Sequence, residues 1–191
     1  MQRNLITQIV DSVVTSTNLR EVLVNTTELV GQAFGASRCV MLQWGGDREI
    51  SASPGSSPVE WSDEIPDPSL DAYSITLAKV IQSHTLTLSS PLAVRDAFGE
   101  KRLSMVREEI ELLRVGSILA VTTRFRGVPN GTIIIYSCSG IRNWTVEETD
   151  ALSYIAHFVG AAIYHTRKAS ELTEERGLVD VARHSRDTHA R

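Results

Sequence analysis

The sequence contains only two cysteines, Cys39 and Cys138, and it lacks any apolar run near the roughly 20 residues that span a bilayer. Two thiols so far apart do not make a disulfide framework, and neither belongs to a CxxC pair or a Cys/His cluster with zinc spacing. The amino-terminal residues begin an amphipathic pattern and not a signal segment. We therefore expect a cytoplasmic protein without membrane contact.

The chain also lacks a dense run of lysine and arginine before its last quarter, and its net charge is −4. A protein that binds nucleic-acid phosphates needs a basic surface, so a nucleic-acid partner is not expected. No Gly-Lys-Ser/Thr phosphate loop and no Gly-x-Ser-x-Gly nucleophile elbow is present, which argues against nucleotide hydrolysis and serine hydrolase chemistry. With 42% hydrophobic residues among 191, the chain can bury the core of one ordinary domain.

The first half of the chain predicts two helices followed by strands. Apolar residues at helical spacing predict a helix over 4–16. A second helix is expected to begin after the cap at Thr17 and Asn18 and to end at Gly35. The β-formers of 38–44 predict a strand, and a tight turn leads to a second strand over 48–53. Prolines and serines make 54–69 an expected irregular loop.

The second half predicts short helices, two long strands and a long final helix. Thr145 and Glu148 form a capping box, which places the start of a helix expected to reach Arg176. The other expected elements are helices around 70–81 and 103–113, a short strand over 85–88, and strands over 117–125 and 132–138 joined by residues 126–131. This order predicts an α+β fold, with terminal helices on one face of an antiparallel sheet and a roof of loops and short helices on the other.

The segment from Cys138 to Trp144 reads Cys-Ser-Gly-Ile-Arg-Asn-Trp and precedes the final helix. This segment resembles the corner between the last strand and the last helix of GAF domains from cyanobacterial sensors, which include cyanobacteriochromes and histidine kinases. The resemblance covers roughly residues 5–168. It implies a GAF domain over 1–168 and a helical extension or linker over 169–191.

The resemblance also implies which cofactors to test for. Cyanobacteriochromes attach a linear tetrapyrrole through the cysteine of a Cys-His pair, and the corresponding positions here are Met105 and Val106. Neither residue can form the thioether, so a covalent bilin is not expected. The spaced pattern of cyclic-nucleotide-binding GAF domains is absent, and the cofactor stays unknown.

A ligand pocket is expected beneath the roof, because the resemblance places such sites on that face of the sheet. The alternative is that the same side chains fill the space themselves. The candidate ligand-binding residues are Trp61, Tyr73, Phe98, Met105, Val106 and Glu109.

The function implied is a non-catalytic sensory or regulatory domain that signals as a homodimer through its terminal helices, with a signalling protein as a possible further partner. One alternative is a ligand-free interaction or assembly module, and another is a small redox enzyme that uses Cys39 or Cys138. No metal site is expected, since His84, His157 and His165 each stand alone. The candidate dimer-interface residues are Ile9, Val13, Ile155, Val159, Ala162 and Thr166.

Overall fold

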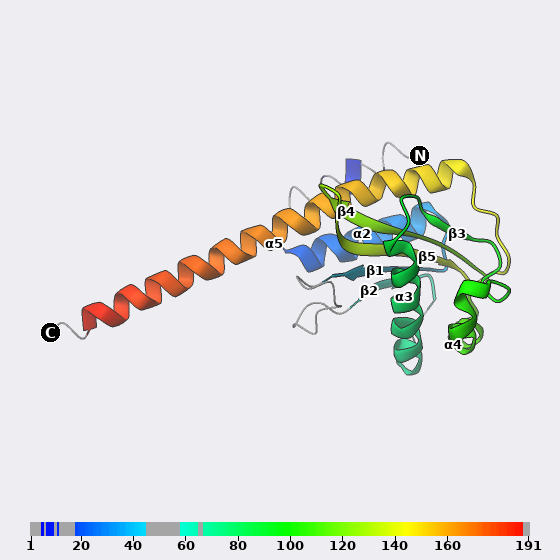
Figure 1. Ribbon diagram of the computed structural model, residues 1–191, viewed down its shortest axis with the longest axis horizontal. Coiled ribbons are helices and arrows are strands. Elements are labelled where there is room, and N and C mark those ends of the chain that lie inside the picture. The colour runs from blue at the N-terminus through cyan, green and yellow to red at the C-terminus, as the bar shows by residue number, and fades with distance from the viewer. Residues whose placement is uncertain are drawn as a thin grey trace.

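A computed structural model describes residues 5, 7–9, 11, 18–44, 58–64 and 67–188. It contains a five-stranded antiparallel sheet in the order β2-β1-β5-β4-β3, which confirms the predicted fold class (Figure 1). The strands are β1 (Arg38–Gln43), β2 (Val59–Ser62), β3 (Leu92–Val94), β4 (Ser117–Phe125) and β5 (Val128–Ser137). The helices are α2 (Leu19–Ala33), α3 (Asp71–Leu86), α4 (Arg107–Leu112) and α5 (Val146–Thr188), with short 3-10 turns η1 (Pro68–Leu70) and η2 (Lys101–Val106).

The central strands are buried on both faces, which explains why they read as continuous apolar runs. Alternate side chains enter two cores. On one face, which we call the helix face, Cys39, Leu119 and Ile135 pack with residues of α2 and α5. On the opposite, distal face, Val40 and Ile134 pack with residues of α3, η2 and α4. The terminal helices and the roof therefore lie on opposite faces, as predicted.

Several element boundaries differ from the prediction. Thr85 belongs to α3, where its hydroxyl bonds the carbonyl of Gln82, and the edge strand instead comes later as β3. The expected loop over 54–69 contains β2, a four-residue strand that pairs with β1. The β4–β5 turn is confined to Arg126 and Gly127, which both have positive φ, so β5 begins before residue 132. The expected strand over 48–53 lies outside the described residues.

The amino-terminal helix expected over 4–16 is helical at residues 5, 7–9 and 11, the part of it that the structure describes. The capping box is confirmed, because the amide of Glu148 donates to Thr145 Oγ1 at 3.2 Å and the amide of Thr145 donates to Glu148 Oε2 at 2.9 Å. The helix that it begins, α5, extends beyond the expected end at Arg176 to Thr188. Its first half covers the sheet and its second half projects from the domain (Figure 1).

The β4–β5 hairpin is fixed to α5 at what we call the helix–hairpin joint. Asn130 Nδ2 donates to the carbonyl oxygen of Gly160 at 2.7 Å, and Thr123 Oγ1 donates to Asn130 Oδ1 at 2.8 Å. The rings of Phe125 and Tyr164 stack with their centroids 4.2 Å apart. Gly160 allows the close approach, because a methyl group there would overlap the backbone of β4.

Arg142 connects α2 to the start of α5. Its guanidinium donates to the carbonyl of Phe34 at 2.9 Å and to that of Gly35 at 3.3 Å, where α2 ends. It also pairs with the carboxylate of Glu148 and lies over the ring of Trp144, 4.2 Å from the ring centroid. One side chain thus joins the ends of two helices on the same face of the sheet.

Candidate functional site

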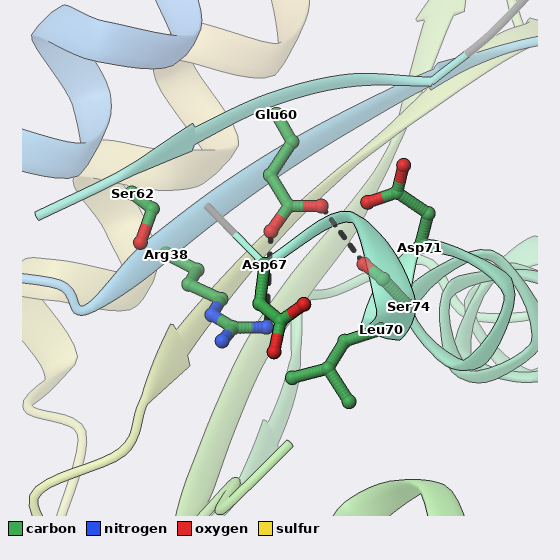
Figure 2. A pocket seen from close by; sticks show the side chains of 7 residues that line it. All are labelled: Arg38, Glu60, Ser62, Asp67, Leu70, Asp71 and Ser74. Atoms are coloured by element: carbon green, nitrogen blue, oxygen red, sulfur yellow. Dashed lines mark hydrogen bonds and ion pairs between the residues drawn. The ribbon is translucent and has the colours of Figure 1, made fainter. Parts of the chain in front are cut away.

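A hollow of about 150 Å³ opens on the distal face, at the edge of the sheet formed by β1 and β2. We call it the β1–β2 hollow (Figure 2). Its walls come from the first residue of β1, from β2, from η1 and from the first turns of α3. The lining residues are Arg38, Glu60, Ser62, Asp67, Leu70, Asp71 and Ser74.

Arg38 is the cation of the hollow, and its side chain is only 17% exposed. The nearest carboxylate oxygen, Glu60 Oε1, lies 3.9 Å from its Nη1, which is an ion pair but exceeds hydrogen-bond distance. Within the described part of the chain, the guanidinium donates no hydrogen bond. The Glu60 carboxylate is instead bonded by Ser74 Oγ at 2.8 Å, as Figure 2 shows. Arg38 therefore keeps a planar set of donors for another acceptor.

Tyr136 lies beside Arg38, since the two are directly paired across β5 and β1 and project from the same face. Its side chain is buried, with 1% of the residue exposed, and its hydroxyl has no hydrogen-bond partner. Burial and the negative charge of Glu60 raise the pKa of Tyr136, and the positive charge of Arg38 lowers it. The phenol is thus a neutral donor without an acceptor, close to both charged groups of the hollow.

Two carboxylates lie at the exposed rim of the hollow. Asp67 caps η1, where its Oδ1 accepts from the amide of Ser69 at 2.9 Å and from the Ser69 hydroxyl at 2.7 Å. These bonds lower the pKa of Asp67. Asp71 begins α3. Together with Glu60 and Arg38, the lining carries one positive and three negative charges, a formal net of −2.

The structure does not bring the predicted ligand-binding residues together. Trp61 lies in β2 with its ring on the helix face, against Gly31 of α2, and so on the opposite side of the sheet from the hollow. Phe98 is 51% exposed beneath the guanidinium of Arg107, and Met105 is 77% exposed, so neither is enclosed. The remaining three also lie outside the hollow: Val106 is buried in the distal core, Tyr73 packs against that core, and Glu109 is half-buried on α4.

The structure places most of the predicted dimer-interface residues in the core of one chain. The α5 residues that the sequence predicts for the dimer interface form the side of the helix that packs on the sheet. Ile9, Ile155, Val159 and Ala162 are all at most 2% exposed. Thr166 is half-buried, and Val13 lies outside the described residues.

Both cysteines have a raised pKa, which is the opposite of what a reactive thiol needs. Burial is the main cause at Cys39, with a contribution from the charge of Glu60. At Cys138, burial is again the main cause, and the nearby Arg38 partly opposes it. Neither thiol is present as thiolate near neutral pH.

The burial of Cys39 predicts that stability declines in alkaline solution. The unfolded thiol ionises near pH 8.5, whereas the folded one stays protonated, so proton loss favours the unfolded chain above that pH. We expect the free energy of unfolding to fall by about 1.4 kcal/mol per pH unit from this group. Urea unfolding at pH 7.5 and 9.5 measures the decline. The variant Cys39→Ala should show a smaller decline, and an unchanged one would contradict this account.

Among the described residues, no three His, Cys, Asp or Glu side chains converge closely enough to hold a metal ion. His157 donates from Nδ1 to the carbonyl of Ser153 at 2.8 Å, and His84 Nε2 lies 2.9 Å from the carbonyl oxygen of Arg102. His165 contacts the rings of Phe125 and Tyr164. None of the helices in the described ranges is both long and apolar enough to cross a membrane.

Comparisons with known proteins agree with this architecture. The model of the GAF domain family matches residues 18–163. No curated protein sequence matches the chain. Among solved structures, the phycoerythrobilin-bound GAF domain of a cyanobacterial phytochrome matches with a TM-score of 0.64 and 15% identity, over 89% of this chain and 98% of that one.

Two further structures share the fold at similar identity. The GAF3 domain of a Synechocystis protein, in its photoproduct state, gives a TM-score of 0.63 at 16% identity, over 81% of this chain and 99% of that one. The free methionine-R-sulfoxide reductase of Neisseria meningitidis, in complex with its substrate, gives a TM-score of 0.64 at 14% identity, over 88% of this chain and 91% of that one. At such identities the likeness establishes the fold alone.

Proposed function

Because this chain belongs to the GAF domain family, we propose that it is a non-catalytic sensory or regulatory domain of the cytoplasm. In this proposal the β1–β2 hollow binds a small ligand and paired α5 helices pass the signal on. The observation that supports it most is the guanidinium of Arg38, which lines the hollow and has no hydrogen-bond acceptor within the described residues. The buried hydroxyl of Tyr136, beside Arg38 on the neighbouring strand, also has no partner, and a buried donor without an acceptor is costly.

The size of the hollow supports a ligand much smaller than a bilin. Structural neighbours include a GAF domain bound to phycoerythrobilin and a reductase bound to its substrate. Pockets for drug-sized ligands have volumes of about 300–1,000 Å³, whereas the hollow measures about 150 Å³. Most of the remaining distal face is occupied by buried side chains such as Leu77, Ile118 and Ile134. A linear tetrapyrrole would have to displace them.

Strand β1 provides a direct route from the hollow to the output helix. Arg38 begins the strand and lines the hollow, and Gln43 ends it. The Oε1 atom of Gln43 accepts from Arg167 of α5 at 3.1 Å. A ligand that favours one position of β1 would thereby favour one position of α5, which is how binding shifts a conformational equilibrium.

The proposed dimer uses a different line of α5 from the one first predicted. Tyr154, Phe158, Ala161, His165 and Leu172, which we call the α5 stripe, are spaced alternately by four and three residues and then by seven. That spacing is typical of a coiled-coil seam. Tyr154 is 54% exposed, and its ring meets that of Phe158 edge-on at 5.2 Å. A second copy of α5 is the proposed occupant, because the helix continues beyond the sheet that covers its other side.

Charge placed in the α5 stripe should dissociate the dimer. We expect Phe158→Glu to weaken self-association at least tenfold, since burying a carboxylate in an apolar seam is unfavourable. Analytical ultracentrifugation of the full chain measures the effect, with Val128→Glu as control because Val128 is exposed on the β4–β5 hairpin. A native chain that stays monomeric at 100 µM, or a control that dissociates equally, would overturn the dimer. Native mass spectrometry of the purified protein reports subunit number and any retained small molecule together.

A second candidate function is an interaction or assembly module that needs no ligand. The filled distal core is the observation that favours it. This candidate predicts that no small molecule is retained and that Arg38→Gln leaves partner binding unchanged. The third candidate, a redox enzyme, is opposed by the raised pKa of both thiols.

A further inference from the structure

We infer that the β1–β2 hollow binds a small free amino acid, a zwitterion that carries one carboxylate and one ammonium group. This inference rests on the proposed ligand-binding function and names the chemical class of the ligand. Three features of the hollow support it: the donors of Arg38 beside the buried Tyr136, the charge of the rim, and the volume.

The donors of Arg38, which line the hollow, favour a ligand that carries a hydrogen-bond acceptor. Arg38 and Tyr136 are neighbours on adjacent strands, and both are donors that lack an acceptor within the described residues. A guanidinium presents parallel N–H groups that match the two oxygens of a carboxylate, and charge-assisted bonds of this kind are strong. Glu60 cannot serve as that acceptor in this arrangement, because it lies 3.9 Å away and is bonded by Ser74. The carboxylate of a bound molecule would supply that acceptor to Arg38.

The acidic rim of the hollow favours a ligand that also carries a positive charge. The lining has a formal net charge of −2, from Arg38 against Glu60, Asp67 and Asp71. A phosphate or a simple dicarboxylate would meet three carboxylates and be repelled. A metal ion is no better, since the acidic side chains do not converge as metal ligands within the described part of the chain. In a zwitterion, the ammonium group pairs with the carboxylates of the rim, and the carboxylate accepts hydrogen bonds from Arg38.

The volume limits the size of the ligand. A cavity of 150 Å³ holds a molecule such as benzene, with six non-hydrogen atoms. The hollow has about this volume, and L-alanine also has six non-hydrogen atoms. The hollow is open at its rim, where Asp67 and Asp71 are exposed, so a slightly longer side chain can extend outward. Leu70 supplies the apolar wall for such a side chain.

Isothermal titration calorimetry of the full chain with each of the twenty common L-amino acids tests the inference. We expect at least one small member to bind, with L-alanine as the reference probe. Propionate lacks its ammonium group and ethylamine lacks its carboxylate, and each should bind at least tenfold more weakly than the amino acid. Equal binding of ethylamine would indicate a site for cations alone and would overturn the inference, as would equal binding of propionate.

Three variants tie binding to the hollow. Arg38→Gln should weaken binding roughly 10- to 100-fold through loss of a charge-assisted bond. Tyr136→Phe removes only a hydroxyl that has no partner, so it should fold at least as well as the native chain and bind several-fold more weakly. Arg20→Gln, on the exposed side of α2, is the matched control and should bind normally. Full affinity in both Arg38→Gln and Tyr136→Phe would contradict the assignment.

Native mass spectrometry separates failure of this inference from failure of the proposed function. If no amino acid binds, but a molecule of another class is retained by the native chain and lost from Arg38→Gln, the amino-acid assignment falls and ligand sensing at the hollow stands. If nothing is retained and the native chain binds no amino acid, both fall, and the ligand-free interaction module is favoured.

Discussion

Replacing Gly160 by alanine is expected to destabilise the fold by about 2 kcal/mol, although alanine is the better helix former. The intrinsic preference favours alanine by about 1 kcal/mol. Against this, the new methyl group would overlap the backbone of Arg124 in β4, and overpacking of this kind costs about 1–3 kcal/mol. Moving α5 away to relieve the overlap would also weaken the bond from Asn130 to the Gly160 carbonyl, which contributes about 1 kcal/mol.

Urea unfolding monitored by circular dichroism measures this loss. His157→Ala is the matched control, because His157 lies on the exposed side of the same helix, and it should change stability by no more than about 0.5 kcal/mol. A Gly160→Ala protein as stable as the native one would mean that hairpin and helix adjust freely, and that the joint does not fix the position of α5.

Replacing Arg142 by alanine is expected to cost about 2–4 kcal/mol, because one side chain satisfies several groups. Its loss leaves the carbonyls of Phe34 and Gly35 at the end of α2 without their donor. It also removes the cation from the carboxylate of Glu148 and from the ring of Trp144. Bonds to charged groups contribute about 1.5–3 kcal/mol, and a partly exposed cation–π contact about 0.5–1 kcal/mol.

The lysine variant tests whether the shape of the guanidinium matters. Arg142→Lys keeps the charge but cannot bond two carbonyls and a carboxylate with one planar group, so it should recover less than half of the loss. Lys79→Ala, on the exposed side of α3, controls for removal of a surface charge and should change stability by at most about 0.5 kcal/mol. If Arg142→Ala behaved like this control, the junction would contribute nothing to stability.

Local chemistry made the fold predictable. The capping box needs only Thr145 and Glu148 at the right spacing, and the structure contains both of its hydrogen bonds. The long strands were predictable because their β-formers are buried on both faces of the sheet. The element boundaries were less predictable from sequence. Thr85, for example, is a β-branched residue, but it lies in α3, where the hydroxyl of Thr122 of β4 bonds it.

The site was harder to predict, because its residues converge from separate strands. Arg38 and Tyr136 become neighbours only through the pairing of β1 with β5. A signal was present, since the charged Arg38 begins a strand whose next four residues are apolar and Glu60 stands in another strand. The face of Trp61 was not predictable, because the prolines and serines of 54–69 indicate a loop and the face of a residue follows from strand register.

For a related reason, the sequence predicts the dimer interface on the side of α5 that packs on the sheet. The helix carries two apolar lines, and periodicity alone does not say which one meets the sheet. The line through Ile155 and Val159 has branched apolar side chains at these two positions, which pack in the core. The line through Tyr154 and Phe158 has larger, partly polar side chains and is the more exposed one.

The continuity of α5 has a mechanical consequence. At 1.5 Å per residue, the roughly 20 residues beyond position 168 form a rod about 30 Å long. A tilt of roughly 5° where the rod leaves the sheet would move its tip by about 3 Å by simple geometry on that length. The strands and side chains around Arg167 therefore need to shift by only a fraction of an ångström to produce a displacement that a neighbouring domain could detect.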